Sequence, residues 1–175
     1  MNTFYLNTCE LKDKIPLLTV GDKVYLSGTV YTARDAAHKR IFDLISENKP
    51  LPFDIKNAVI YYAGPTPTPE NLAIGSCGPT TSSRMDKYTP TLLDLGLICT
   101  IGKGQRSEEV INSISKNKSV YLCAIGGAGA LAAQHIKKCE VIAFEDLGCE
   151  SIKKLEFDSF PLIVAIDKYG NNIFK

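Results

Sequence analysis

Strand-like and helix-like segments alternate along the middle of the chain, and this alternation limits the possible folds more than any other feature. Alternating polarity with β-branched or aromatic residues predicts strands, whereas apolar stripes of helical period predict helices. The predicted strands comprise residues 22–33, 57–64, 97–102, 119–126 and 140–145. The predicted helices comprise residues 34–48, 82–96, 107–117 and 129–138.

The C-terminal end follows a different pattern. Residues 153–159 and 160–174 are extended, and we expect them to form adjacent strands with a turn at Lys168–Asn171. We also expect the helix at 82–96 to be interrupted near Pro90. Strand–helix alternation with β-rich ends predicts an α/β domain with a mixed sheet, not a plain Rossmann fold. The length of 175 residues fits one domain, which spans residues 1–175.

Charge and hydrophobicity exclude several classes of protein. The formal net charge is +1, which gives no electrostatic reason to expect binding to nucleic acid or to an anionic membrane. No apolar run approaches the roughly 20 residues that span a bilayer. The first residues lack the basic and apolar regions of a secretory signal. We therefore expect a cytoplasmic protein that binds neither nucleic acid nor membranes.

The cysteines are too widely spaced for a common metal site. No two lie closer than ten residues, so there is no C-x-x-C pair of the kind that zinc and iron–sulfur sites use. We expect most of them to be buried, reduced and structural, because free thiols in apolar stretches behave as small hydrophobic groups. Cys77 stands apart because it lies beside a Gly-Pro-Thr-Thr bend. The full set is Cys9, Cys77, Cys99, Cys123, Cys139 and Cys149.

Two glycine-rich stretches each follow a predicted strand and precede a predicted helix. Backbone amides at such a bend can bind an anion, and Lys103 and Arg106 flank the glycines of GKGQRS at 102–107. Neither this stretch nor GGAGA at 126–130 matches a P-loop or a dinucleotide fingerprint. Tight turns that require glycine are the alternative explanation, and it suits 126–130 better than 102–107.

A third polar group lies in ARDAAHKR, where the strand at 22–33 meets the following helix. Arg34 can bind a carboxylate with its planar guanidinium, and Asp35 can cap the helix or hold a cation. His38 can carry a proton near neutral pH, or it can be a structural histidine. We expect His135, in AAQHIKK, to be a helix-surface residue without a functional role.

The most unusual stretch is GPTTSSRMDKYTP at 78–90, which places four consecutive hydroxyl side chains and an arginine at one bend. One interpretation is a capped helix, and the other is a pocket for a small anion. Strong cations and hydroxyl donors at these bends would suit a dicarboxylate, with one arginine for each carboxylate. The candidate residues are Arg34, His38, Thr80, Thr81, Arg84 and Lys103.

The stretches TARDAAHKR, GPTTSSRMD and GKG, with the tail FPLIVAIDKYGNNIF, resemble a known family. This is the β-subunit of the iron–sulfur-dependent class I fumarases and of L-tartrate dehydratase, which is also the C-terminal domain of single-chain class I fumarases. The resemblance runs from about residue 19 to the C-terminus, and GPTTS-x-R-M is its most specific part. Ser83 departs from the pattern, because many relatives have glycine there.

The resemblance implies a swivelling β/β/α fold and a hydro-lyase that is active only with an α-subunit, in an α2β2-type assembly. That α-subunit would carry a [4Fe–4S] cluster, and this chain would bind no cofactor. The expected reaction is the reversible hydration of fumarate to L-malate. One alternative is the conversion of L-tartrate to oxaloacetate and water. Another, outside the family, is a stand-alone phosphate- or nucleotide-binding protein that uses residues 102–107 and 126–130.

The resemblance also implies a role for each candidate residue. Thr80 resembles the proposed base, and Thr81 would lie beside it at the reacting carbon. His38 matches a histidine treated as catalytic in related β-subunits. The carboxylates of the substrate would be bound by Arg34, Arg84 and Lys103.

Overall fold

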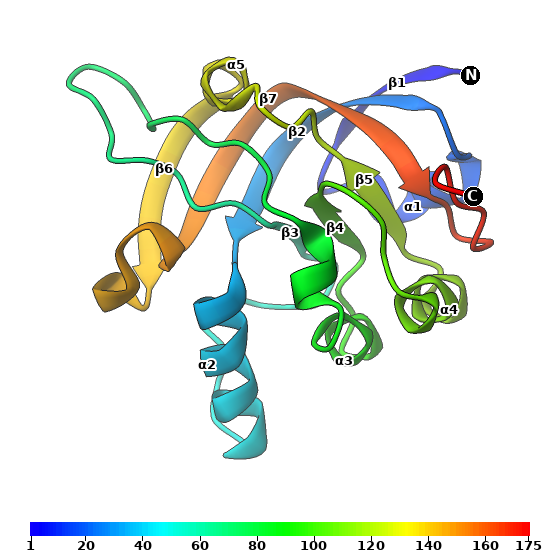
Figure 1. Cartoon of the computed structure of the whole chain (residues 1–175), viewed down its shortest axis with the longest axis horizontal. Coiled ribbons are helices and arrows are strands. Elements are labelled where there is room, and N and C mark those ends of the chain that lie inside the picture. The colour runs from blue at the N-terminus through cyan, green and yellow to red at the C-terminus, as the bar shows by residue number, and fades with distance from the viewer.

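Seven strands form one mixed sheet in the computed structural model, which describes residues 1–175 (Figure 1). The strands are β1 (Thr3–Asn7), β2 (Lys23–Thr32), β3 (Val59–Tyr61), β4 (Cys99–Gly102), β5 (Val120–Cys123), β6 (Ile136–Ala143) and β7 (Ile152–Ile166). Their order in the sheet is β1-β2-β3-β4-β5-β7-β6, and β2 also pairs with β7. The circuit β2-β3-β4-β5-β7 therefore closes on itself, and the sheet curls into a barrel-like shape.

Strand direction decides where the loops gather. Strands β2, β3, β4 and β5 are parallel to their neighbours in that order, whereas β7 runs antiparallel to β2, β5 and β6. Parallel strands need crossover connections, and most of the helices lie in these connections. The carboxyl ends of β2 to β5 consequently lie along one edge of the sheet.

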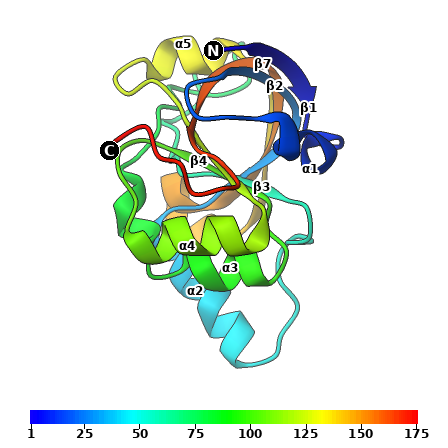
Figure 2. The ribbon, with the colours of Figure 1, turned by 90° about the vertical axis from the view of Figure 1, so that its right-hand side faces the viewer.

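Three of the five α-helices lie together at one end of the molecule (Figures 1 and 2). The α-helices are α1 (Leu11–Lys14), α2 (Asp35–Ser46), α3 (Thr89–Asp94), α4 (Glu108–Asn117) and α5 (Gly129–Gln134). The 3₁₀ helices are η1 (Ile15–Leu17), η2 (Ser82–Met85) and η3 (Glu145–Glu150). Helices α2, α3 and α4 lie together, and α5 lies at the other end in both views (Figures 1 and 2). None of the helices has the length and apolar character needed to cross a bilayer.

Two apolar clusters hold the sheet and the helices together. One cluster is built mainly from side chains of all seven strands, and the other lies between the sheet and helices α2, α3 and α4. Strand β3 serves both: Val59 and Tyr61 join the first cluster, and Ile60 joins the second. Successive side chains of a strand point to opposite faces, so a strand covered on both faces is apolar throughout.

The predicted mixed α/β sheet is confirmed, and so is the interruption of the helical segment at 82–96, although its first part is a 3₁₀ helix. The structure splits it into η2 and α3, and the break falls at residues 86–88. Pro90 lies directly after this break, in the first turn of α3. Proline has no backbone N–H, and the first turn of a helix is where that donor has no partner anyway.

The helix predicted at 129–138 is too long. Helix α5 ends at Gln134, and Ile136 already pairs with Phe157 as the first residue of β6. Pairing with a neighbouring strand outweighs the helical tendency of these residues. His135 accordingly lies at the C-terminal cap of α5, and its Nδ1 is 3.0 Å from the carbonyl oxygen of Asp158.

The two adjacent C-terminal strands predicted at 153–174 are one long strand. Strand β7 pairs with β2 along most of its length and continues past Ser159, where φ is 51° at a bulge in the pairing. The predicted turn at Lys168–Asn171 is confirmed. The Asp167 carboxylate accepts hydrogen bonds from backbone N–H groups of this turn.

Candidate functional site

Four bends follow the carboxyl ends of the parallel strands β2, β3, β4 and β5 and meet at one edge of the sheet. In α/β sheets, ligands bind at the carboxyl edge of the parallel strands. The first three bends, at 33–35, 62–82 and 103–107, carry or immediately precede all the candidate residues. These are Arg34, His38, Thr80, Thr81, Arg84 and Lys103.

Backbone hydrogen bonds fix the Thr-Thr bend between β3 and β4. The N–H of Thr80 donates to the carbonyl oxygen of Tyr62 at 2.7 Å. The N–H of Ser82 donates to the carbonyl oxygen of Lys103, and the N–H of Lys103 donates to Oγ of Ser82, each at 3.0 Å. Thr81 and Lys103 are thereby paired as neighbours in a short parallel bridge. The predicted threonines and lysine therefore lie side by side.

The hydroxyl run divides into structural and free members. Ser82 is buried, and its Oγ also accepts a hydrogen bond from the Tyr121 hydroxyl at 2.9 Å. A side chain at Gly102 would collide with this Oγ, because its Cβ would lie 2.0 Å away. Thr80 is half-buried and Thr81 is exposed, and neither hydroxyl makes a hydrogen bond within the chain. Ser82 is thus the structural member of the run, whereas the hydroxyls of Thr80 and Thr81, like that of the exposed Ser83, remain available to a ligand.

Arg34 lies at the start of α2 and reaches across the bend that follows β3. A Cβ at Gly64 would lie 3.0 Å from both Cδ and Nη1 of Arg34, so a larger residue at position 64 would crowd the arginine. The nearest acidic oxygen to its Nε is Oε1 of Glu150, at 3.7 Å. This Nε is buried and has no hydrogen-bond partner. Arg34 is thus held in place by packing while its donors are incompletely used.

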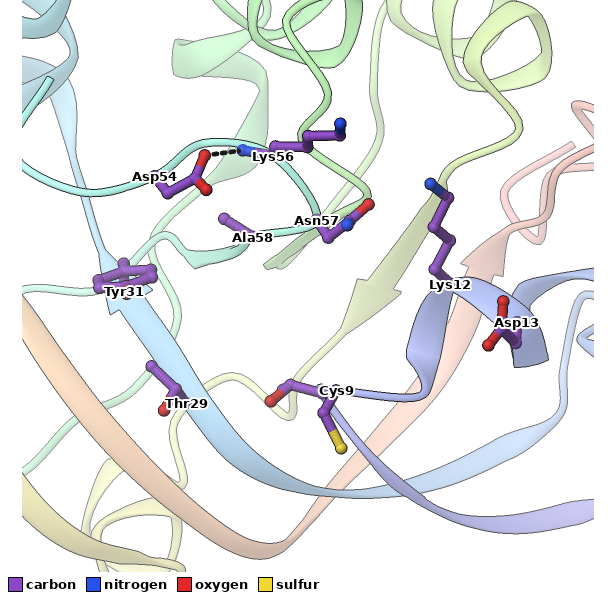
Figure 3. Close-up of a pocket in the computed structure, with 10 residues that line it drawn as sticks. Cys9, Lys12, Asp13, Thr29, Tyr31, Asp54, Lys56, Asn57 and Ala58 are labelled. Atoms are coloured by element: carbon purple, nitrogen blue, oxygen red, sulfur yellow. Dashed lines mark hydrogen bonds between the residues drawn. The ribbon is translucent and has the colours of Figure 1, made fainter. Parts of the chain in front are cut away.

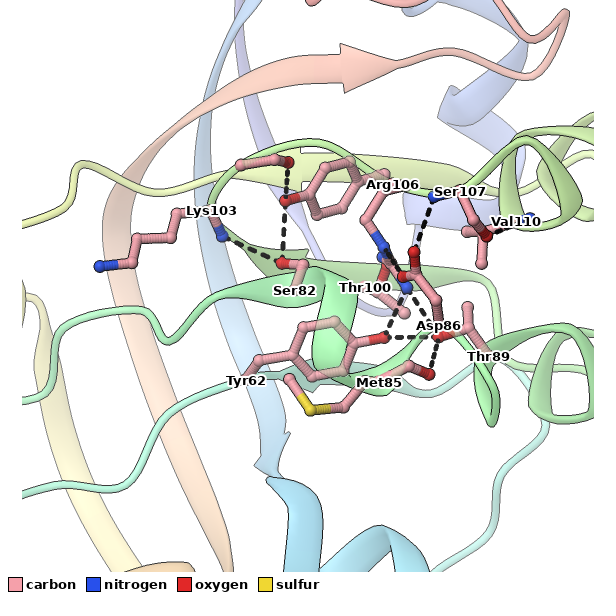
Figure 4. A network of polar contacts seen from close by, with 12 residues as sticks. Tyr62, Ser82, Met85, Asp86, Thr89, Thr100, Lys103, Arg106, Ser107 and Val110 are labelled. Carbon is pink, nitrogen blue, oxygen red and sulfur yellow. Dashed lines mark hydrogen bonds and ion pairs between the residues drawn. The ribbon is translucent and has the colours of Figure 1, made fainter.

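Arg84 and Lys103 occupy different situations. The Arg84 guanidinium is half-exposed and forms a two-bond ion pair with the Asp35 carboxylate at the start of α2. The Lys103 side chain lies against Gly126, where a Cβ would be 3.3 Å from its Cδ. The Lys103 ammonium forms no ion pair within the chain, and Figure 4 shows it pointing away from the buried network beside it.

His38 is fully buried beneath the start of α2. Its Nδ1 lies 2.8 Å from the carbonyl oxygen of Arg34, so Nδ1 carries the hydrogen and Nε2 is left as a bare acceptor without a partner. The ring stacks on Tyr88 and meets Tyr62 edge-on. Burial lowers the pKa of His38 to about 4. His38 is therefore neutral at physiological pH and contacts Arg34, not solvent.

Arg106, which the sequence suggested as a partner for an anion, has a structural role. Its side chain is 0% exposed, and its Nε donates to Oδ1 of Asp86 at 2.6 Å. The guanidinium also donates to hydroxyls of Thr89, Thr100 and Tyr62, as Figure 4 shows. Buried charges require such compensation. With its donors bound inside the protein, Arg106 cannot bind a ligand.

The glycine-rich bend at 126–130 is packed against the chain itself. The N–H of Cys77 donates to the carbonyl oxygen of Gly129 at 3.0 Å. A Cβ at Gly129 would lie 2.9 Å from the backbone nitrogen of Gly78. Close backbone contact explains glycine at position 129, and the positive φ of 76° at Gly127 agrees with the turn interpretation.

The cysteines do not assemble into a ligand set. All are free thiols, and no group of three His, Cys, Asp or Glu side chains is arranged to hold a metal ion. The residues of this chain therefore do not fit an iron–sulfur cluster. The prediction that most of the cysteines are buried is wrong: Cys77 and Cys99 are buried, Cys123 and Cys139 are half-buried, and Cys9 and Cys149 are exposed. Cys77 is buried, and burial raises the pKa of its thiol to about 12, so it is not a nucleophile.

The largest cavity lies away from the candidate residues. It has a volume of about 500 Å³ (Figure 3). The residues that line it are Thr8, Cys9, Lys12, Asp13, Thr29, Tyr31, Asp54, Lys56, Asn57 and Ala58. Residues 54–58 enter β3 from the end opposite the bend at 62–82. None of the candidate residues lines this cavity. Arg34, Thr80, Thr81, Arg84 and Lys103 are half-buried or exposed, and we call the surface that they form the open wall.

Sequence reasoning missed the residues that hold the candidates in place. Glu150 faces Arg34, Tyr62 and Tyr88 enclose His38, and Gly126 supports Lys103. These contacts join distant parts of the chain, so no local pattern predicts them. Glycine at 64, 102 and 126 was the only visible signal, because glycine often marks close approach.

The sequence matches a known protein family along its whole length. The family model, described as Fumarase C-terminus, covers residues 1–175. Fumarate hydratase 2 of Leishmania major is 40% identical over 167 residues, which are 94% of this chain and 29% of that protein. The putative L(+)-tartrate dehydratase subunit beta of Methanocaldococcus jannaschii is 41% identical over 170 residues, 94% of this chain and 87% of that protein. The L(+)-tartrate dehydratase subunit beta of Escherichia coli strain K12 is 33% identical over 161 residues, 89% and 79% of the two chains. The chain thus spans about 30% of the length of the fumarate hydratases it matches.

Proposed function

Because the chain belongs to the Fumarase C-terminus family, we propose that it is the β-subunit of a two-chain class I fumarate hydratase. This hydro-lyase would hydrate fumarate reversibly to L-malate in the cytoplasm. The observation that carries the proposal is the open wall at the carboxyl edge of the sheet, where free hydroxyls and unsatisfied cations meet. We further infer that residues 1–175 act as one catalytic unit with the swivelling β/β/α fold of the family.

The cations of the wall suit the two carboxylates of fumarate or malate. Arg34 and Arg84 have planar guanidinium groups that bind a carboxylate with two parallel hydrogen bonds. Lys103 adds an unpaired ammonium directly beside the Thr-Thr bend. We assign these three residues to substrate binding, with the arginines at opposite ends of the substrate.

We assign proton transfer at carbon to Thr80. In the dehydration direction, its oxygen would take the proton from one carbon of malate while hydroxide leaves the adjacent carbon, which forms the double bond. In the hydration direction, the same proton returns to carbon and hydroxide adds next to it. A threonine hydroxyl is a weak base unless nearby positive charge stabilises its alkoxide, and Lys103 and Arg84 are the cations available. Thr81 would lie beside Thr80 at the reacting carbon.

We assign His38 a positioning role in the catalytic unit. It is buried and neutral, and its hydrogen bond goes to the carbonyl group of Arg34. Through this bond it would fix the start of α2, from which Arg34 extends. A group that is closed off from solvent in this way cannot abstract a proton from the substrate unless the site rearranges.

We place the [4Fe–4S] cluster on the partner α-subunit, because the thiols of this chain do not converge. Bound there, the cluster would supply Lewis acidity to the reaction. The relatives support a partner: two of them are named as beta subunits, and the fumarate hydratases are about three times as long as this chain. We propose an α2β2-type assembly.

The apolar surface around α5 supports the same partner. None of the α5 residues is buried, although five of the six are Gly, Ala or Leu. Ile125 and Leu131 are more than 60% exposed, and apolar hollows flank the helix on both sides. Because Gly126 supports Lys103, this surface continues into the candidate wall. A partner that completes the wall would therefore also cover α5, and exposed apolar patches of this kind commonly mark such contacts.

Tartrate dehydratase is the second candidate. The observation that favours it is length: the chain covers 87% and 79% of two tartrate dehydratase β-subunits but only about 30% of the fumarate hydratases. The two reactions remove water from dicarboxylates that differ by one hydroxyl group. Arg34, Arg84 and Lys103 would bind the carboxylates of malate and of tartrate in the same way, so these residues favour neither substrate.

The proposal is tested by purifying the chain together with its partner and assaying the complex with fumarate, L-malate and L-tartrate under anaerobic conditions. We expect reversible hydration of fumarate by the complex and no activity from the isolated chain. Turnover of tartrate alone would select the second candidate. Loss of co-purification in Leu131→Asp, but not in Tyr5→Asp at a position that is also more than 60% exposed, would place the partner on α5. Activity of the iron-free isolated chain would contradict the two-chain assignment.

A further inference from the structure

Arg84 is the one candidate cation whose guanidinium is already hydrogen-bonded within the chain. Its Nε donates to Oδ1 of Asp35 at 3.0 Å, and its Nη2 donates to Oδ2 of the same carboxylate. The hydrogen bond from Arg84 lowers the pKa of Asp35, so the carboxylate stays ionised throughout the neutral range. The pair joins η2, which follows the Thr-Thr bend, to the first residue of α2.

This pairing uses only one edge of the guanidinium. The group has five N–H donors in a rigid plane, and the edge formed by Nε and Nη2 binds Asp35. The edge formed by Nη1 and the second hydrogen of Nη2 remains free. That free edge has the geometry to bind a second carboxylate with two parallel hydrogen bonds. Asp35 therefore fixes the plane of the guanidinium without consuming the edge that a substrate would use.

Asp35 also faces the other arginine of the wall. Its Oδ2 lies 4.0 Å from Nε of Arg34, which on its other side faces Glu150 at 3.7 Å. The four side chains therefore form a row in space in which positive and negative charges alternate: Arg84, Asp35, Arg34 and Glu150. The Asp35 carboxylate lies between the two arginines, so contact with it constrains the distance between their guanidinium groups.

Stability alone does not account for this ion pair. The side chains of Arg84 and Asp35 are 45% and 42% exposed, and exposed pairs of this kind contribute little to folding. The same helix offers a comparison, because Arg40 of α2 forms a two-bond pair with Asp146 of η3. That second pair contains none of the candidate residues. The two pairs share their chemistry and differ in their place relative to the wall.

We propose that Asp35 is a positioning residue that holds Arg84, and with it the spacing of the two arginines, ready for the carboxylates of a small dicarboxylate. The inference rests on the proposed function for its substrate class. It adds a residue that acts through Arg84 and does not touch the substrate. Preorganised donors bind more strongly than free ones, because the entropy of ordering them is lost before the substrate arrives.

The experiment compares Asp35→Ala with Asp146→Ala in the assembled enzyme, this chain purified with its partner subunit. For Asp35→Ala we expect KM for the dicarboxylate to rise about ten- to a hundredfold, because the guanidinium is no longer oriented. We expect kcat of Asp35→Ala to fall less than its KM rises. For Asp146→Ala we expect the melting temperature and the KM to stay unchanged. A KM for Asp35→Ala at or below that of the unchanged enzyme would overturn the proposal and identify Asp35 as a competitor of the substrate.

A double-mutant cycle distinguishes an effect through Arg84 from a general one. If Asp35 acts through Arg84, then Asp35→Ala should add almost nothing to the loss in kcat/KM caused by Arg84→Ala. Fully additive losses would contradict the proposal.

A measurement that needs no activity separates this inference from the proposed function. In nitrogen-15 NMR spectra of the full chain, the Arg84 Nε–H should be protected from exchange and lose that protection in Asp35→Ala. An enzyme that transforms none of the three dicarboxylates would defeat the proposed function. An unprotected Nε–H in the unchanged chain would defeat the role of Asp35, whatever the reaction.

Discussion

Arg106 and Arg84 follow neighbouring bends at the same edge of the sheet, yet the protein uses them in opposite ways. Arg106 is enclosed, and its donors bind Asp86 and three hydroxyl groups. Arg84 is half-exposed and keeps one edge of its guanidinium free. The same side chain therefore serves either the fold or a ligand, according to how many of its donors the protein has already satisfied.

The hydroxyl groups show the same division. Ser82 and Thr89 are buried and hydrogen-bonded, whereas Thr80 and Thr81, in the same stretch of sequence, make no side-chain hydrogen bond. Satisfied buried polar groups rigidify a structure, and unsatisfied groups at its surface are free to bind. The buried hydrogen-bonded network around Arg106 thus rigidifies the bends that carry the open wall.

Removing the buried cation should have the largest effect on stability. Arg106→Met leaves the Asp86 carboxylate without its main partner, and breaking a buried pair in this way lowers the free energy of unfolding by about 3–5 kcal/mol. Urea denaturation of the purified chain measures this change. Arg40→Met, which breaks an exposed pair with Asp146, is the control and should change stability little. Equal effects of the two variants would remove the distinction between buried and open arginines.

Removing the free hydroxyl of the wall should instead affect only catalysis. We expect Thr80→Ala in the assembled enzyme to lower kcat by about a thousandfold, within the range for loss of a proton-transfer group. The KM should change little, because the cations that bind the carboxylates remain. Steady-state kinetics in both directions measure these values.

The controls for Thr80 keep the hydroxyl or move the change. Thr80→Ser retains an oxygen and should keep much of the activity, and Ser83→Ala removes an exposed hydroxyl nearby with little consequence. A mild effect of Thr80→Ala, together with a severe effect of His38→Asn, would transfer the role of base to His38.

His38 lies between the buried network and the open wall, and the pH dependence of protein stability should report its protonation. Its pKa is about 4 in the folded protein and about 6.5 in an unfolded chain, so below pH 6.5 the unfolded state binds the proton first. Stability should therefore fall as pH decreases from 6.5 to 4, by about 3 kcal/mol from this residue alone. Urea denaturation between pH 4 and 7 measures the slope.

The matched variant for this measurement is His38→Asn. Asparagine can still donate to the carbonyl group of Arg34, but it does not titrate, so the acid-dependent loss should be about 3 kcal/mol smaller. The difference between the two proteins isolates His38 from carboxylates such as Asp22 and Asp35, whose lowered pKa values also make stability fall in acid. An identical slope in both proteins would show that His38 is accessible to protons in the folded state.

Much of the fold could be predicted from the sequence. The segments 22–33 and 34–48 became β2 and α2 because their periodicity and polarity agree with their final surroundings. The prediction failed where the tertiary structure outweighed local preference. Residues 136–138 left a helical pattern to pair with β7, and residues 153–166 formed one strand because β2 and β6 pair with its whole length.

The candidate wall was predictable only in part. Hydroxyl and cationic residue types at three bends indicated an anion, and the parallel strands bring those bends together as their directions require. The sequence could not separate Arg106 from Arg84, because each stands near glycine or hydroxyl residues and carries the same charge. Nor could it show that His38 is enclosed between Tyr62 and Tyr88.

The sequence by itself determined the alternation of strands and helices, the types of functional group at each bend, and the family. The tertiary structure decided which cationic and hydroxyl groups form hydrogen bonds inside the protein and which remain free to bind a ligand. Local pattern depends on neighbours in the chain, whereas burial and hydrogen-bond satisfaction depend on residues far away, such as Asp86 for Arg106 and Asp35 for Arg84. For this reason the identity of the open cations became known only when distant segments were seen in contact.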